Sequence, residues 1–69
     1  MGVPHGFSYE YDENGKLFEV WEYNNSHAVY RQEMNGKVKH GQKEFFRLND
    51  KGENEVYRTE EWVNGQLVK

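Results

Sequence analysis

The side chains of this sequence that could bind a metal or activate water are few, and their spacing does not bring them together. The histidines are His5, His27 and His40, and no two of them are two or four residues apart. Cysteine is absent, so a zinc cluster of the usual ligands is not predicted. His5 and His40 each precede a glycine, and we expect them to be polar residues beside turns. His27 is expected to be a solvated loop residue.

A nucleophile or an acid-base pair is equally hard to find. Apart from tyrosine, the hydroxyl side chains are Ser8, Ser26 and Thr59, and their spacing from the histidines supports no catalytic triad. Glu60 and Glu61 are adjacent, so on a strand they would point to opposite faces and could not form a dyad. No phosphate-binding loop, nucleophile elbow or metalloprotease helix occurs. We therefore predict a protein that is not an enzyme and uses no cofactor.

Aromatic residues are the strongest functional signal in the sequence. Five Tyr, four Phe and two Trp make up 16% of the 69 residues, and a thin sheet of this size cannot cover all of these rings. Exposed aromatic patches bordered by charge commonly mark protein-binding surfaces, although burial in the core is the alternative for any single ring. The predicted partner-binding residues are Tyr9, Tyr11, Trp21, Tyr23, Tyr30, Phe45, Arg47, Tyr57 and Trp62.

The elements that must position these rings are short strands separated by turns. Asn14-Gly15, Asn35-Gly36 and Asn64-Gly65, with Asp50-Lys51-Gly52, have the residue types of tight turns between antiparallel strands. Most segments between them alternate with period two, which is typical of half-buried strands, whereas residues 17–23 and 45–48 have apolar side chains on both faces. The alternation places Ala28, Tyr30, Gln32 and Met34 on one face. It likewise groups Val56, Arg58, Glu60 and Trp62, with Tyr57, Thr59 and Val63 opposite.

We predict a single all-β domain over residues 1–69. Its strands are expected at residues 6–11, 17–24, 28–34, 42–48, 54–63 and 66–68. Helices over 42–48 or 55–63 are the alternative, because Glu, Lys, Arg and Gln favour helices. Recurring aromatic and β-branched residues and the lack of a capping pattern argue against them.

The sequence also resembles itself. His5-Gly6 and His40-Gly41 each precede a strand with an aromatic residue five positions beyond the glycine, followed by a glycine turn and a strand containing Trp. The second copy has two additional residues before its glycine turn. We therefore divide the chain into repeat-like units over 5–26, 27–39 and 40–68. A single hairpin cannot bury its apolar face, so such units must pair into one sheet.

The segment from Gly6 to Leu17, GFSYEYDENGKL, resembles the MORN repeat in the variant found in bacterial antitoxin-like proteins. Residues 35–41 and 62–67 follow the same order of turn, glycine and aromatic strand, so the resemblance covers residues 5–68. It implies an antiparallel β-meander of about five or six strands, built from hairpin repeats in a single twisted sheet. Asn25-Ser26-His27 stands where a glycine turn is expected, and Asn49–Gly52 is lengthened. A partly closed meander is therefore the alternative.

The resemblance also implies protein association, and the bacterial variant is associated with neutralising toxins or effectors by direct binding. We expect a non-catalytic binding module, namely a small bacterial or phage inhibitor of antitoxin or immunity type that blocks a toxin, effector or host enzyme. A self-assembling homodimer, through a sheet edge or face, is one alternative. A single-stranded nucleic-acid binder is another, with a modest basic track at Lys37, Lys39, His40, Lys43 and Arg47.

Charge and hydropathy restrict these classes. The net charge of -3 disfavours general nucleic-acid binding and attraction to anionic membranes. No apolar run approaches the ~18 residues that span a bilayer, and no signal-peptide region is recognised, so a cytoplasmic protein is expected. Met1-Gly2 begins like a myristoylation motif, but Gly6 replaces the Ser or Thr that this motif needs. Asn24-Asn25-Ser26 is a glycosylation sequon that we interpret as an ordinary loop.

Overall fold

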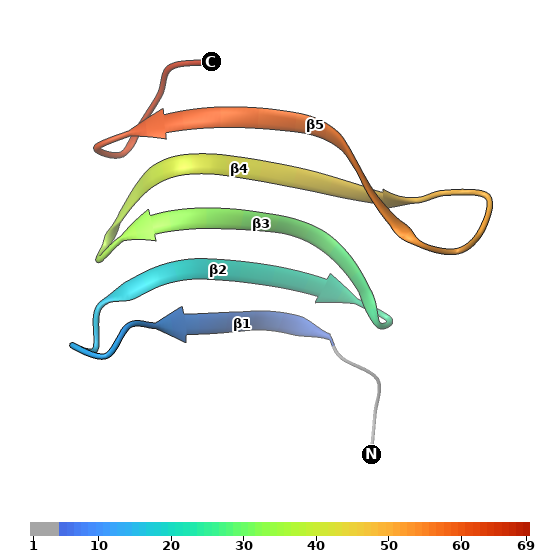
Figure 1. Ribbon diagram of the computed structural model, residues 1–69, viewed down its shortest axis with the longest axis horizontal. Coiled ribbons are helices and arrows are strands. Elements are labelled where there is room, and N and C mark those ends of the chain that lie inside the picture. Colours follow the sequence, from blue (N-terminus) through green and yellow to red (C-terminus); the bar gives the residue numbers. More distant parts are fainter. Residues whose placement is uncertain (1–4) are drawn as a thin grey trace.

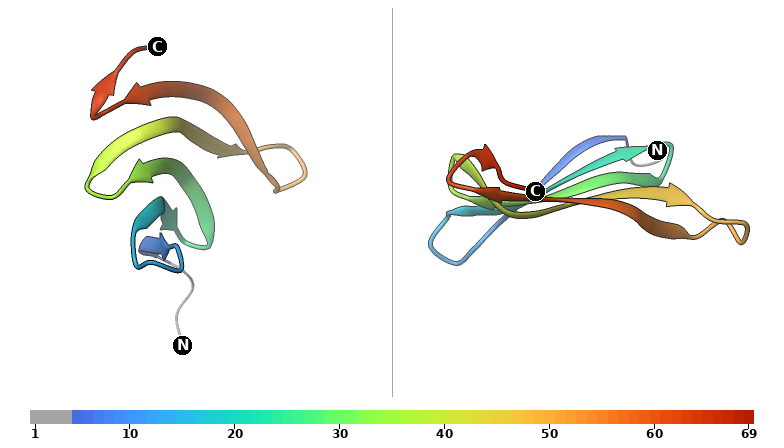
Figure 2. Two further views of the ribbon diagram at one scale, coloured as in Figure 1. Left: turned by 60° about the vertical axis from the view of Figure 1, so that its left-hand side comes forward. Right: turned by 90° about the horizontal axis from the view of Figure 1, so that it is seen from above.

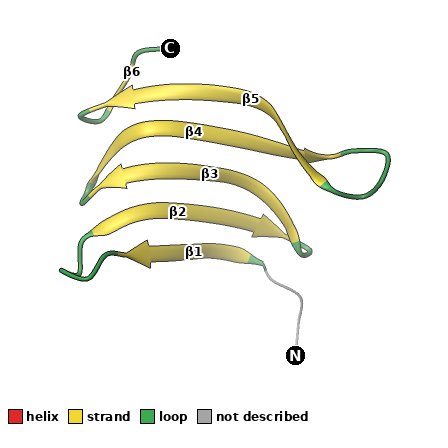
Figure 3. Ribbon diagram, in the orientation of Figure 1, coloured by secondary structure: helices red, strands yellow, loops and turns green. Residues whose placement is uncertain are grey.

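The computed structural model describes residues 5–69, which form one six-stranded antiparallel sheet (Figures 1 and 3). The strands pair in chain order, so every connection is a hairpin. Their bounds are β1 Gly6–Tyr11, β2 Leu17–Asn24, β3 His27–Asn35, β4 Val38–Leu48, β5 Asn54–Val63 and β6 Gln66–Leu67.

The predicted all-β antiparallel meander is confirmed. The sheet is a single open layer, so the partly closed alternative is wrong, as are helices over 42–48 or 55–63. β4 begins at Val38, four residues before the predicted start, because the strand continues through Gly41 despite its φ of 109°. The Met1-Gly2 motif lies outside the described residues.

No second layer covers either face of the sheet within residues 5–69. The buried side chains there are Val20, Ala28 and Gln32, on the interior strands β2 and β3. A sheet with so thin a core depends on cross-strand contacts between side chains for much of its stability. These contacts therefore stabilise the sheet, and they also determine which side-chain groups remain exposed on each face.

The sheet is curved and twisted rather than flat (Figure 2). Register shifts interrupt four of the strand pairs, at Glu10/Tyr11, Glu22/Tyr23, Gln32/Met34 and Phe45/Phe46. An extra residue on one strand of a pair bends that strand and increases its local twist. These irregularities also decide which face each side chain occupies.

Two five-residue turns, Asp12–Lys16 and Asn49–Glu53, have the same hydrogen-bond pattern. In the first, the Asp12 N–H donates to the Lys16 carbonyl (2.9 Å), and the Asp12 carboxylate accepts the N–H groups of Asn14 and Lys16 (both 2.9 Å). The second turn repeats each bond, with the Asn49 side-chain oxygen in the role of the Asp12 carboxylate. The two additional residues of the second copy therefore lie in β4, and the turn itself is not lengthened.

The turn between β2 and β3 lies within residues 25–27, where the repeat pattern predicts a glycine that the sequence lacks. Asn25 and Ser26 form a two-residue loop between the paired residues Asn24 and His27, with φ angles of 51° and 72°. Both central residues of such a hairpin turn need positive φ, which Asn tolerates better than Ser. The sequence thus keeps the expected tight turn without its glycine, at a cost in backbone strain.

We expect Ser26→Gly to raise the free energy of unfolding by about 0.5–1 kcal/mol, because glycine adopts positive φ without the steric penalty of a side chain. Urea unfolding followed by circular dichroism measures the change. Ser8→Gly, the same replacement inside β1, is the control and should destabilise by about 0.5–1 kcal/mol. A loss of stability in Ser26→Gly would contradict the turn assignment.

Candidate functional site: the two faces of the sheet

The strand register divides the side chains between two faces, because directly opposed residues of antiparallel strands point to the same side. Trp21 opposes Arg31, and Arg31 opposes Glu44. We call this side the Arg31 face, comprising Glu10, Glu19, Trp21, Tyr23, Arg31, Glu33, Glu44 and Phe46. The other side is the Lys43 face, comprising Phe7, Tyr9, Glu22, Tyr30, Lys39, Lys43, Phe45, Arg47, Glu55, Tyr57, Arg58, Glu60 and Trp62.

The structure does not bring the predicted partner-binding residues onto one surface. Trp21 and Tyr23 lie on the Arg31 face, whereas Tyr11 lies at the end of β1, where it lines a groove of about 560 Å³ with Leu17 and Met34. The remaining predicted residues share the Lys43 face: Tyr9, Tyr30, Phe45, Arg47, Tyr57 and Trp62.

Simple alternation misplaced residues beside two bulges. On β5 the register passes from Arg58 to Val56 and skips Tyr57, whose ring lies 6.4 Å from that of Phe45, both measured at the centroids. Tyr57 therefore shares a face with Arg58, and Val56 does not. On β3 the same effect separates Ala28, opposite Tyr23, from its predicted companions.

The centre of the Lys43 face is a cation held between aromatic rings. The Lys43 ammonium lies 4.1 Å from the Tyr30 ring centroid and 4.9 Å from that of Phe45. The guanidinium of Arg58 lies 5.2 Å from the Phe45 centroid. Such contacts are worth roughly 0.5–1 kcal/mol each at exposed sites and hold the cation in place. Burial, with the charge of Glu22, raises the pKa of the Tyr30 hydroxyl, which stays neutral at physiological pH.

The same pairing of cation and ring extends to both ends of the Lys43 face. The Lys39 ammonium lies 4.5 Å from the Trp62 ring centroid, and the Arg47 guanidinium lies 5.7 Å from that of Tyr57. The sequence indicated these rings, but it did not show that lysines and arginines would lie over them. The positions of these cations depend on which residues of neighbouring strands pair, and no local sequence pattern predicts that pairing.

Positive charge on the Lys43 face is only partly neutralised. Arg47 forms an ion pair with Glu55 (2.9 Å) and Arg58 with Glu60 (3.0 Å). Among the described residues, no carboxylate oxygen lies within 4.0 Å of the ammonium groups of Lys39 and Lys43. Burial, with the charges of Lys39 and Arg58, lowers the pKa of Lys43 and outweighs the opposing effect of Glu60 and Glu22. The Lys43 face therefore has four cations, Lys39, Lys43, Arg47 and Arg58, and three carboxylates, Glu22, Glu55 and Glu60, which leaves a small excess of positive charge.

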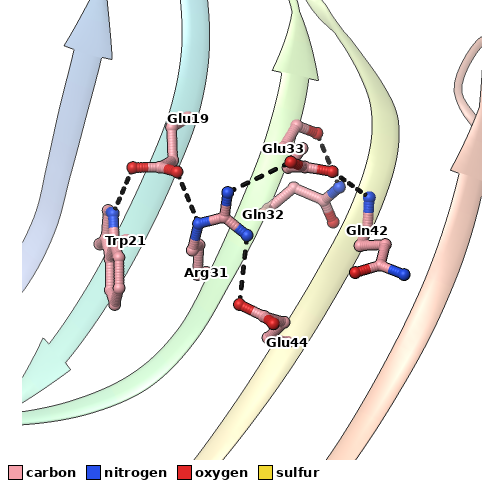
Figure 4. Close-up of polar contacts among 7 residues, drawn as sticks. All are labelled: Glu19, Trp21, Arg31, Gln32, Glu33, Gln42 and Glu44. Carbon is pink, nitrogen blue, oxygen red and sulfur yellow. Dashed lines mark hydrogen bonds and ion pairs between the residues drawn. The ribbon is translucent and has the colours of Figure 1, made fainter. Parts of the chain in front are cut away.

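The Arg31 face is organised by one arginine among three carboxylates (Figure 4). The Arg31 Nε donates to Glu19 (2.5 Å), and its terminal nitrogens donate to Glu44 (3.1 Å) and Glu33 (3.2 Å). The Trp21 indole N–H donates to the second oxygen of Glu19 (2.7 Å). Although burial acts to lower the pKa of Arg31, its hydrogen bonds and ion pairs with Glu19 and Glu33 outweigh burial and raise it. This network connects β2, β3 and β4.

Stacked rings reinforce the Arg31 face. The Trp21 ring lies nearly parallel to those of Tyr23 and Phe46, at centroid distances of 6.0 Å and 5.6 Å. Phe46 belongs to β4, so its contact with Trp21 reaches across β3. The carboxylates of this face form ion pairs with the Arg31 guanidinium, and the rings stack on one another. We infer that these contacts hold the strands together.

Residues 5–69 contain no group of three His, Cys, Asp or Glu side chains placed to hold a metal ion. The two turn-flanking histidines do not meet, because β2 and β3 separate β1 from β4 in the sheet. The His40 Nδ1 instead accepts the Asn64 backbone N–H (3.1 Å) and so connects β4 to the turn after β5.

No protein-family model, curated protein or solved structure matches this chain. In the described part of the chain, no helix is long and apolar enough to cross a membrane. The functional interpretation therefore depends on what the two faces of the sheet can contact.

Proposed function

We propose that this protein is a non-catalytic binding module that holds another protein against its Lys43 face. The observation that carries the proposal is a row of aromatic rings on one face of a single-layer sheet, over which residues 5–69 place no second layer. Phe7, Tyr9 and Tyr57 are each more than half exposed, at 57%, 53% and 54%. Exposed aromatic side chains beside arginines are the groups that contribute most to protein-protein binding.

The Arg31 face is the less suitable contact surface. Its central charges already pair with one another, so a partner would have to compete with existing ion pairs. Truncating such a network mainly changes stability, because it leaves charges without partners. We therefore assign the Arg31 face to holding the strands together.

The hairpin repeat supports a role in protein association. The matching turns at Asp12–Lys16 and Asn49–Glu53, and the positive φ of Gly6 (97°) and Gly41 (109°), fit a degenerate MORN-like repeat. Under this proposal the protein is a small bacterial or phage inhibitor of antitoxin or immunity type. It acts in the cytoplasm by covering a toxin, effector or host enzyme.

Self-association is a second candidate, favoured by the open edges of the sheet. Among the described residues, β1 has no outer neighbour, and the pairing of β6 with β5 is limited to Trp62 and Val63. Unpaired strand edges readily pair with another chain. Light scattering over a concentration series tests this candidate, and a strict monomer at all concentrations would remove it.

To test the proposed function, immobilised protein is exposed to lysate of the source organism, and the retained proteins are quantified for wild type and two variants. Tyr57→Ser alters the Lys43 face at an exposed ring, whereas Tyr23→Ser is the matched change on the Arg31 face. We expect Tyr57→Ser to reduce retention of a specific partner by about tenfold or more. Tyr23→Ser should retain it, with circular dichroism confirming the fold of both variants. The proposal would be contradicted if Tyr57→Ser retained the partner as well as wild type does, or if wild type retained no specific partner.

A further inference from the structure

The two lysines of the Lys43 face are cations without a carboxylate partner, each held over an aromatic ring. Lys39 lies over Trp62, and Lys43 lies over Tyr30 and Phe45. An approaching carboxylate would gain ion pairs with cations that are already in position, so little side-chain entropy would be lost on binding. Burial and the charges of Lys39 and Arg58 lower the pKa of Lys43 despite the opposing charges of Glu60 and Glu22, and an added negative charge would act in the same direction as the two glutamates. The surface is therefore complementary to acidic groups.

From this complementarity we infer that the partner contacts the Lys43 face with an acidic polypeptide segment, in which carboxylates alternate with aromatic or apolar side chains. The inference rests on the function proposed above and specifies the chemistry of its partner. The carboxylates pair with Lys39 and Lys43, and the apolar side chains pack on exposed rings such as Phe7 and Tyr9.

A nucleic acid fits this surface less well, although it is also an anion. Bases bind such proteins by stacking on open aromatic faces. Here Lys43 and Arg58 lie over Phe45, and Arg47 lies over Tyr57, so cations already occupy the positions where bases would stack.

A second copy of the chain also fits less well. Of its acidic groups, Glu19, Glu33 and Glu44 already bind Arg31, and Glu55 and Glu60 already pair with Arg47 and Arg58. Pairing them with the lysines of another copy would require those bonds to break.

The test uses a fluorescent twelve-residue peptide of alternating Glu and Tyr, titrated with the purified protein at low ionic strength. Its controls are an alternating Lys and Tyr peptide and a twelve-nucleotide oligothymidine. Two double variants lose the same charge: Lys39→Met with Lys43→Met on the Lys43 face, and Lys16→Met with Lys51→Met in exposed turns. We expect the first to weaken binding of the acidic peptide by about tenfold or more, and the second by about twofold or less. Added salt should weaken wild-type binding.

Several results would overturn the inference. The first is that the basic peptide binds as tightly as the acidic peptide. The second is that the two double variants lose equal affinity for the acidic peptide. The third is that the oligothymidine binds more tightly than the acidic peptide, which would favour a nucleic acid as the partner. Self-association that disappears in the Lys39→Met, Lys43→Met variant would make a second copy the occupant. If the acidic peptide fails to bind but Tyr57→Ser still abolishes partner retention, only the inference about acidity fails. If Tyr57→Ser has no effect on retention, the proposed function fails as well.

Discussion

Replacing Arg31 with Leu is expected to lower the free energy of unfolding at pH 7 by about 2–3 kcal/mol. The substitution leaves Glu19, Glu33 and Glu44 close together without the guanidinium that binds all three. Breaking a fully buried ion pair costs roughly 3–5 kcal/mol, but the Arg31 side chain is 22% exposed, so water screens part of the repulsion. The loss should still be among the largest for any single charged residue here, because one side chain connects three strands.

Urea unfolding at pH 7 and at pH 4 measures this effect. Acid protonates carboxylates and removes their mutual repulsion, so the stability gap between wild type and Arg31→Leu should narrow at pH 4. Arg47→Leu is the control, since Arg47 forms one exposed ion pair with Glu55, and it should cost about 0.5 kcal/mol or less. If Arg31→Leu does not fold, Arg31→Lys retains the charge without the three-way geometry and should cost about 1 kcal/mol. Equal effects of Arg31→Leu and Arg47→Leu, or a gap that does not change with pH, would exclude this role for Arg31.

The strands could be predicted because their signals are local. Asn-Gly pairs favour tight turns through their own backbone preferences, and period-two alternation depends only on neighbouring residues. The turn at Asn25-Ser26 lacks glycine, but the alternation of residues 28–34 follows it, and β3 begins within one residue of its predicted start. Local chemistry is therefore sufficient to predict a meander in which every strand pairs with its neighbour in sequence.

The face of each side chain could not be predicted in the same way. Tyr57 lies on the same face as Arg58 because β5 has a bulge at this point in its pairing with β4. The position of the bulge depends on which residues of the two strands pair. A shift of one residue reverses the facing of every side chain beyond it. Alternation therefore placed Tyr57 on the wrong face, opposite Arg58. It also could not show that the aromatic residues are divided between the two faces of the sheet.

The cations of the Lys43 face depend on a similar irregularity. Between β3 and β4 the register passes from Gln32–Lys43 to Met34–Lys39, so β4 has two more residues than β3 in this interval. The interval contains Gly41, whose φ of 109° lies in a region that other residues rarely adopt. Gly41 therefore sets how Lys39 and Lys43 are placed relative to β3, and its replacement tests that placement.

Gly41→Ala should lower the free energy of unfolding by about 2 kcal/mol, the sum of backbone strain and a steric clash. A β-carbon at this position would lie 2.9 Å from the Glu33 β-carbon and closer still to the Glu33 carboxylate. That carboxylate accepts the Gln42 N–H (2.6 Å) and an Arg31 N–H, so displacing it disturbs the network of the Arg31 face as well.

A double-mutant cycle separates the clash from the strain. With Glu33→Ala in the background, Gly41→Ala should cost about 1 kcal/mol less than in wild type, because the clashing side chain is gone. Gly6→Ala provides the matched control, since Gly6 has a φ of 97° but open space around its missing side chain, so only strain remains. Additive effects of Gly41→Ala and Glu33→Ala would show that Glu33 does not pack on Gly41. The irregularity of β4 would then depend on backbone conformation alone, and the placement of Lys39 and Lys43 would be independent of the Arg31 face.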